Sequence, residues 1–159
     1  MITFIIPIKK RKLKENFLEN FKIFSDERQI FFAVEKGCEL NLQTTENERA
    51  KVFFFNEGTR EEDMIESLIS KVDGQTLVII RDGEKDIDFN KIKESVIKQR
   101  EGNDIVVIKN SKKSNFLKTF FSKLLKSLVC KLFGFKFFDG EITVETFSNK
   151  AINILKTNG

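Results

Sequence analysis

Short apolar runs alternate along the chain with stretches whose apolar residues recur at helical spacing. The apolar runs show little polar alternation, which is typical of strands covered on both faces, as in parallel sheets. They lie at residues 2–6, 29–34, 51–55, 77–80 and 104–108. Because strands that alternate with helices of roughly ten residues are characteristic of βαβ units, the pattern predicts an α/β fold with a mostly parallel, Rossmann-like sheet flanked by helices.

Local signals indicate where several of these elements begin and end. Pro7 is expected to stop the first strand, because proline has no backbone N–H to donate. Residues 59–62, Thr-Arg-Glu-Glu, match a capping box, so Thr59 is expected to cap a helix. Asp88 is expected to cap the next helix. The predicted inward positions of that helix are Phe89, Ile92, Val96 and Ile97.

Acids or amides follow three of the first four predicted strands. They are Glu35, Asn56 with Glu57, and Asp82 with Glu84. Right-handed crossovers place the carboxyl ends of parallel strands along one edge, which is where open α/β sheets bind ligands. There, Asp82 and Glu84 could hold a hard divalent cation that bridges phosphates. The alternative is a solvated Asp-Gly turn after the strand, and the local sequence leaves both interpretations open.

The composition limits the chemistry that such a site can use. A chain of 159 residues is expected to form one domain over residues 1–159, and 33% charged with 40% hydrophobic residues indicates a globular protein. The sequence has 18 Phe but no His, so acid–base or metal chemistry must fall to Asp, Glu, Lys or Cys. Cys38 and Cys130 match no zinc spacing and are expected to be reduced thiols.

Residues 111–138 form a basic amphipathic segment. On a helical wheel its apolar arc exceeds half the circumference, and Lys118, Lys123 and Lys126 share the opposite side. Two interpretations stay open: a core helix with lysines in water, or a helix lying on an anionic membrane surface. The net charge of +4 favours anionic partners in general. No nucleic-acid partner is expected, because the Phe residues of this segment share the inward-facing arc with Leu.

Targeting signals are not apparent in the sequence. No basic leader or cleavage site surrounds the first apolar run, and no apolar stretch reaches the roughly 18 residues of a membrane-spanning helix. We therefore expect a cytoplasmic protein that would contact a membrane as a peripheral protein on its inner face.

The order of these segments resembles the nucleotide-binding region of family 2 glycosyltransferases, which have the GT-A fold. The resemblance is greatest to polyprenyl-phosphate sugar synthases similar to dolichyl-phosphate mannose synthase, and it is collinear along the chain. Residues 3–7, Thr-Phe-Ile-Ile-Pro, resemble the family's opening strand. Residues 82–92 lie where the family has Asp-x-Asp followed by a loop and a helix. The other similar segments are residues 29–35, 51–58, 102–107 and 123–152.

The resemblance implies a glycosyltransferase that binds a nucleotide-diphosphate sugar through Mg or Mn. Asp82 and Glu84 would hold the metal. Asp139 and Glu141 would be the catalytic residues, since an acidic residue of the family removes the proton of the acceptor. The acceptor would be a lipid phosphate or a glycan. The implied contacts to the nucleotide sugar are Pro7, Lys9, Glu35, Asn56, Gly58 and Asp82.

The sequence also departs from the family pattern. Residues 9–11, Lys-Lys-Arg, replace Tyr-Asn-Glu, and Val34 with Glu35 replaces paired aspartates. Residues 139–143 lack the Pro-Thr-Ser-Gly of their counterpart, and the resemblance stops before the family's last strand and basic acceptor-side segment. A catalytically inactive relative that acts as a binding or membrane-peripheral module is therefore the alternative function.

Overall fold

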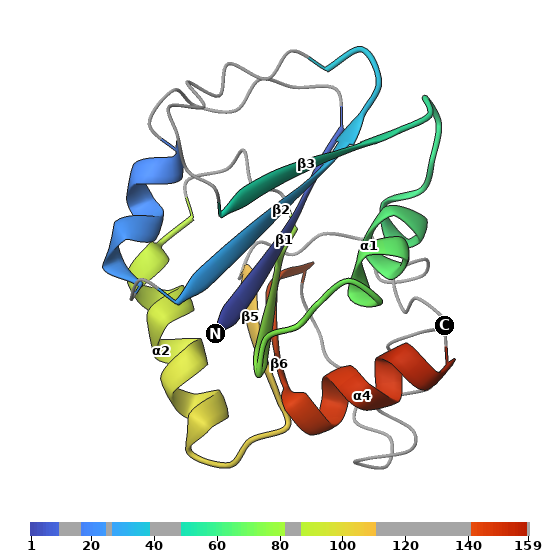
Figure 1. Cartoon of the computed structure of the whole chain (residues 1–159). Helices are drawn as coiled ribbons and strands as arrows, with labels where there is room; N and C mark the ends of the chain where they lie inside the picture. Colours follow the sequence, from blue (N-terminus) through green and yellow to red (C-terminus); the bar gives the residue numbers. More distant parts are fainter. Residues whose placement is uncertain (10–16, 25–26, 39–48, 82–86, 111–140, 159) are drawn as a thin grey trace.

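The computed structural model describes residues 1–9, 17–24, 27–38, 49–81, 87–110 and 141–158 (Figure 1). Strands and helices alternate along most of this part of the chain. The strands are β1 (Ile2–Ile8), β2 (Arg28–Glu35), β3 (Ala50–Phe55), β4 (Thr76–Ile80), β5 (Ile105–Asn110) and β6 (Glu141–Ser148). The helices are the 3₁₀ helix η1 (Phe17–Ile23) and the α-helices α1 (Glu61–Ile69), α2 (Phe89–Arg100) and α4 (Asn149–Asn158).

In the described part of the chain the strands form one six-stranded sheet in the order β3-β2-β1-β4-β6-β5. β1 pairs in parallel with β2 and β4, and β2 pairs in parallel with β3. β6 runs antiparallel to both of its neighbours, β4 and β5. One face of the sheet is covered by η1 and α2 and the other by α1 and α4 (Figure 1). The predicted α/β fold with a mostly parallel sheet is therefore confirmed.

β1 is an inner strand of the sheet, and all 7 of its residues are buried. Its side chains alternate between two cores, as strand geometry requires. Phe4 and Ile6 belong to the core beneath η1 and α2, whereas Ile5 belongs to the core beneath α1 and α4. Burial on both faces explains why the predicted strand lacked polar alternation.

Phenylalanine rings fill much of the core beneath η1. The centroid of the Phe4 ring lies 4.9 Å from those of Phe21 and Phe24. Phe21 also contacts Phe17 at 5.5 Å and Phe89 at 5.0 Å, both in edge-to-face geometry. Such pairs contribute beyond the area that they bury, so this cluster accounts for part of the high phenylalanine content.

Pro7 does not stop the first strand, because β1 continues to Ile8. Ile2 donates its backbone N–H to the Glu27 carbonyl on the β2 side. The main-chain N–H and C=O groups of every second residue of β1 therefore point toward β2, and the main-chain nitrogen of Pro7 lies on the β4 side. The pairing of β1 with β4 ends at Ile5. The missing N–H of Pro7 therefore removes no ladder hydrogen bond, which is how an inner strand tolerates proline here.

The predicted capping box of α1 is wrong. The helix begins at Glu61 with Arg60 as its N-cap, and no side chain caps it by a hydrogen bond. Thr59 instead donates its hydroxyl to the backbone oxygen of Asn56 at 2.7 Å. The first turn of α1 is acidic, with Glu61, Glu62 and Asp63, and acids there interact favourably with the helix dipole.

The predicted start of α2 is confirmed, since the Asp88 carboxylate accepts the backbone N–H of Asn90 at 3.0 Å. Ile92 and Val96 are buried as expected, but Ile97 is 49% exposed. One residue corresponds to about 100° of helical rotation, so a position directly after Val96 turns away from the sheet.

The strand β6 and the helix α4 were not predicted. β6 lies between β4 and β5 and completes the sheet as its antiparallel member.

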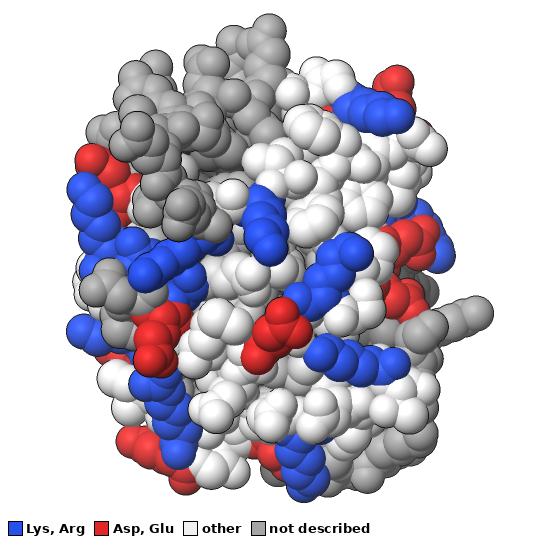
Figure 2. All heavy atoms as spheres, viewed as in Figure 1, with Lys and Arg blue, Asp and Glu red and all other residues white. Residues whose placement is uncertain are grey.

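On the face seen in Figure 2, basic side chains lie among acidic ones with uncharged surface between them. The net charge of +4 is therefore not gathered into one patch on the described part of this face.

Replacing Phe21 by Ala should lower the free energy of unfolding by about 3–5 kcal/mol, because it leaves a cavity in the aromatic cluster. The matched control is Phe54→Ala on the edge strand β3, where the side chain is 64% exposed and the change should be small. Urea unfolding followed by circular dichroism measures both. Equal losses in the two variants would contradict the described packing.

Candidate functional site

The carboxyl ends of β1, β2, β3 and β4 meet at one edge of the sheet, because these four neighbours are parallel. The chain proceeds from β1 to β2 and β3 on one side and then returns to β4 on the other. The carboxyl ends of the neighbours β1 and β4 therefore mark a topological switch point, where open α/β sheets bind their ligands. The expected convergence of these strand ends is confirmed, and this carboxyl edge is the candidate site.

Glu35 joins the end of β2 to the turn that follows β3. It is only 2% exposed, and its carboxylate accepts the backbone N–H of Gly58 at 2.6 Å. Gly58 has φ +80°, a backbone conformation that residues with a side chain rarely adopt, so this position favours glycine. Beside it, the Lys36 ammonium donates to the Asn56 side-chain oxygen at 3.1 Å. The structure therefore brings together three predicted site residues, Glu35, Asn56 and Gly58, in a turn contact.

Lys9 connects the end of β1 to the same turn. Its ammonium donates to the backbone oxygen of Thr59 at 2.6 Å, across 50 residues of sequence. Pro7, two positions earlier, is a buried residue of β1. Lys9 therefore places a half-buried positive charge beside the switch point.

Arg81, the residue directly after β4, occupies a buried ionic network that the sequence analysis missed. Its Nε donates to the Glu145 carboxylate of β6 at 2.8 Å, and its Nη1 donates to Glu61 of α1 at 3.1 Å. The Glu62 carboxylate lies 3.9 Å from the same nitrogen. The Arg81 side chain is 10% exposed and the Glu145 side chain is 1% exposed. The network therefore joins β4, β6 and α1 at the carboxyl edge.

The electrostatics of this network keep the guanidinium charged. Burial lowers the pKa of Arg81, but the nearby carboxylates of Glu145 and Glu61 outweigh this effect, so the pKa of Arg81 lies above its ordinary value. The backbone N–H of Arg81 also donates to the Thr143 carbonyl at 2.9 Å. Side chain and backbone together fix Arg81 at the carboxyl edge.

Several predicted functional residues lie outside the described part of the chain. These are Asp82, Glu84 and Asp139, together with Lys118, Lys123 and Lys126 of residues 111–138. Glu141 is described as the first residue of β6, where its main chain pairs with Asn110 at the carboxyl edge. Among the described residues, no group of three acids or cysteines is arranged to hold a metal, and no helix is long and apolar enough to cross a membrane.

No known protein family and no curated protein matches this sequence. Among solved structures, the chain is similar to CMP:2-keto-3-deoxy-manno-octonic acid synthetase complexed with CTP. The TM-score is 0.50 at 7% identity, over 99% of this chain and 78% of that chain. At such identity the similarity establishes the fold alone, an α/β domain with a six-stranded, mostly parallel mixed sheet flanked by helices. Membership in family 2 of the glycosyltransferases stays a prediction.

Replacing Arg81 by Met should lower the free energy of unfolding by about 3–5 kcal/mol, because it leaves Glu145 buried without its cation. Removing both charges, with Arg81→Met and Glu145→Leu together, should recover most of that loss. Arg60→Met is the matched control, since the Arg60 side chain is 76% exposed in its ion pair with Asp63 and should matter little. Urea unfolding of the four proteins provides the measurement, and a harmless Arg81→Met would contradict the network.

Proposed function

We propose that this domain binds a nucleotide, in the form of a nucleotide-diphosphate sugar, at the carboxyl edge between β1 and β4. The observation that supports it most is the switch point itself, within a fold similar to that of a synthetase solved with CTP. The extent of the similarity, 99% of this chain, includes the strands that create the switch point. The neighbouring turn contacts would provide a rigid wall for the ligand.

Lys9 is the described residue best placed to meet the phosphates. One N–H of its ammonium is used by the Thr59 carbonyl, and a lysine ammonium has three, so two donors remain for phosphate oxygens. Lysine binds phosphate as a compact charge, which tolerates many ligand orientations. In this proposal Glu35 acts indirectly, by holding the turn through Gly58 rather than by contacting the ligand.

The proposed chemistry is sugar transfer assisted by Mg or Mn. Asp82 and Glu84 would hold the cation, which neutralises the diphosphate as it leaves. Asp139 or Glu141 would accept the proton of the acceptor, and the position of Glu141 on the carboxyl edge is compatible with that role. Nucleotide binding without transfer would instead indicate the inactive relative.

Uridine, cytidine or guanosine diphosphate should raise the melting temperature only when Mg or Mn is present. Ligand at about 100 times its dissociation constant stabilises by about 2.7 kcal/mol, which differential scanning fluorimetry detects. Asp82→Asn should abolish the metal-dependent shift. Asp88→Asn is the matched control, because asparagine caps a helix as well as aspartate does.

Two outcomes would contradict the proposal. If none of the nucleotides shifts the melting temperature with or without metal, the carboxyl edge is not a nucleotide site. If Asp82→Asn responds to nucleotide and metal as the wild type does, Asp82 is a turn residue and the metal assignment is wrong.

The membrane-peripheral placement is proposed separately, on the basis of residues 111–138. The protein should sediment with vesicles of acidic lipid, because each lysine near an anionic surface contributes about 1 kcal/mol to the binding free energy. Less protein should sediment when salt reduces the Debye length to about 8 Å. Replacing Lys118, Lys123 and Lys126 by Gln should release it. The control replaces Lys91, Lys93 and Lys98, which are exposed on α2. Equal sedimentation with neutral vesicles, or none at all, would exclude an electrostatic attachment.

A further inference from the structure

β3 is the outermost strand on one side of the sheet, and β2 is its neighbour (Figure 1). The carbonyls of Arg49 and Phe55 accept backbone N–H groups from the β2 side at 2.9 and 2.8 Å. Main-chain groups alternate in direction along a strand, so those of Ala50, Val52 and Phe54 point away from the sheet. None of the described residues hydrogen-bonds to these groups. The outer edge of β3 therefore offers a row of unused donors and acceptors.

The side chains of β3 are apolar but poorly covered. Its sequence is Ala-Lys-Val-Phe-Phe-Phe, and none of its residues is fully buried. Phe54 is 64% exposed, more than any other large apolar side chain in the described part of the chain. Aromatic and β-branched residues on an open edge favour pairing with a further strand. The edge thus has both the hydrogen-bonding groups and the apolar surface that a partner strand would cover.

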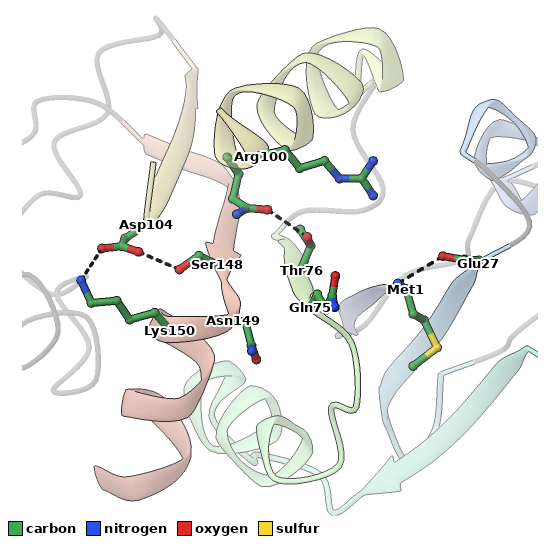
Figure 3. Close-up of a pocket in the computed structure, with 10 residues that line it drawn as sticks. Met1, Glu27, Gln75, Thr76, Arg100, Asp104, Ser148, Asn149 and Lys150 are labelled. Atoms are coloured by element: carbon green, nitrogen blue, oxygen red, sulfur yellow. Dashed lines mark hydrogen bonds and ion pairs between the residues drawn. The ribbon is translucent and has the colours of Figure 1, made fainter. Parts of the chain in front are cut away.

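Two exposed charges beside this edge have no counter-ion among the described residues. They are Lys51 within β3 and Glu57 in the turn that follows it. Charges elsewhere pair within the chain. At the amino edge of the sheet, for example, Lys150 lies 3.0 Å from Asp104, and the amino terminus lies 3.5 Å from Glu27 (Figure 3). Lys51 and Glu57 are therefore available to a partner that approaches β3.

The positions of these two charges make the edge complementary to itself. Lys51 lies three residues before Phe54, and Glu57 lies three residues after it. If two β3 strands align antiparallel about a two-fold axis at Phe54, Lys51 of each copy comes opposite Glu57 of the other. In the same register the outward main-chain groups of Phe54 meet those of the second Phe54, as a hydrogen-bonded pair requires. A parallel alignment in register would instead bring like charges together. The edge therefore fits a second copy of this chain.

We propose that two copies of the chain associate through their β3 strands, which pair antiparallel about a two-fold axis at Phe54 and join the two sheets into one. The association covers both Phe54 side chains and forms two ion pairs between Lys51 and Glu57. It goes beyond the proposed nucleotide site, which lies between β1 and β4 on the far side of β2. The two proposals therefore succeed or fail separately.

Sedimentation velocity of the whole chain over a range of concentrations tests the association. The wild type should change from monomer to dimer as its concentration rises. Phe54→Pro should stay monomeric, because proline removes an outward N–H that the monomer does not use. Its circular dichroism at low concentration should match that of the wild type. Ile97→Ala is the matched control, since it removes a 49% exposed apolar side chain from α2 and should leave the dimer intact.

Exchange of the two charges tests the register. Lys51→Glu alone and Glu57→Lys alone should each weaken the dimer at least about tenfold, because like charges then lie opposite each other. A mixture of the two variants should form a heterodimer, since each ion pair is restored with its sign reversed. The double variant should also dimerise as the wild type does. Lys91→Glu, an exposed charge change on α2, is the control and should have no effect.

The mixing experiment does not depend on Phe54→Pro, because it changes only exposed side chains. A wild type that is still monomeric at millimolar concentration would overturn the proposal, even if β3 then captured an extended peptide of another protein. A folded Phe54→Pro that still dimerises would place the interface elsewhere. Two charge variants that associate no better together than alone would exclude the antiparallel pairing about Phe54.

Discussion

The buried contact between Arg81 and Glu145 is the constraint on which the arrangement of the sheet depends. Two ionised groups with 10% and 1% exposed side chains are tolerated only in mutual contact, because each alone would lose its hydration without compensation. Glu145 lies on β6, the one strand that runs against its neighbours in the described sheet. A shift of β6 by one residue would turn Glu145 to the other face of the sheet, away from the guanidinium. The pair therefore selects the register of the antiparallel strand.

The same contact organises the carboxyl edge. Glu61 from α1 shares the Arg81 guanidinium, and Glu35 and Lys9 hold the turn after β3 from the two neighbouring strands. Each strand end of the switch point is thus fixed by a hydrogen bond to another element. Groups held in this way need no reordering when a ligand arrives, which lowers the entropic cost of binding.

The sequence predicted the parallel part of the fold because that part depends on local patterns. β1, β2 and β4 are buried on both faces, and a run of apolar residues between helices is sufficient to recognise them. β6 was missed because its sequence, Glu-Ile-Thr-Val-Glu-Thr-Phe-Ser, is rich in polar residues, of which Glu145 and Thr146 are nevertheless buried. Its Glu145 is paired with Arg81, 64 residues away, and its Thr146 shares a hydrogen bond with Ser95 of α2. Such long-range partners leave no signal in a local window.

The candidate site was predicted only as far as it follows from local patterns and topology. Parallel strands bring their carboxyl ends to one edge, so the sequence placed Glu35, Asn56 and Gly58 together at that edge. The hydrogen bond between Glu35 and Gly58 could not be predicted, because it depends on the exact position of two strand ends that are far apart in the sequence.

The absence of His, Tyr and Trp from the sequence explains where the polar contacts of the core are found. Phenylalanine offers a large apolar surface without a polar atom, so the rings that pack between η1, α2 and the sheet cannot orient these elements by hydrogen bonds. Short side chains do so instead. Ser95 meets Thr146 at 2.8 Å, and Thr76 meets Gln99 at 2.9 Å, so α2 is fixed to β6 by one buried pair and to β4 by another.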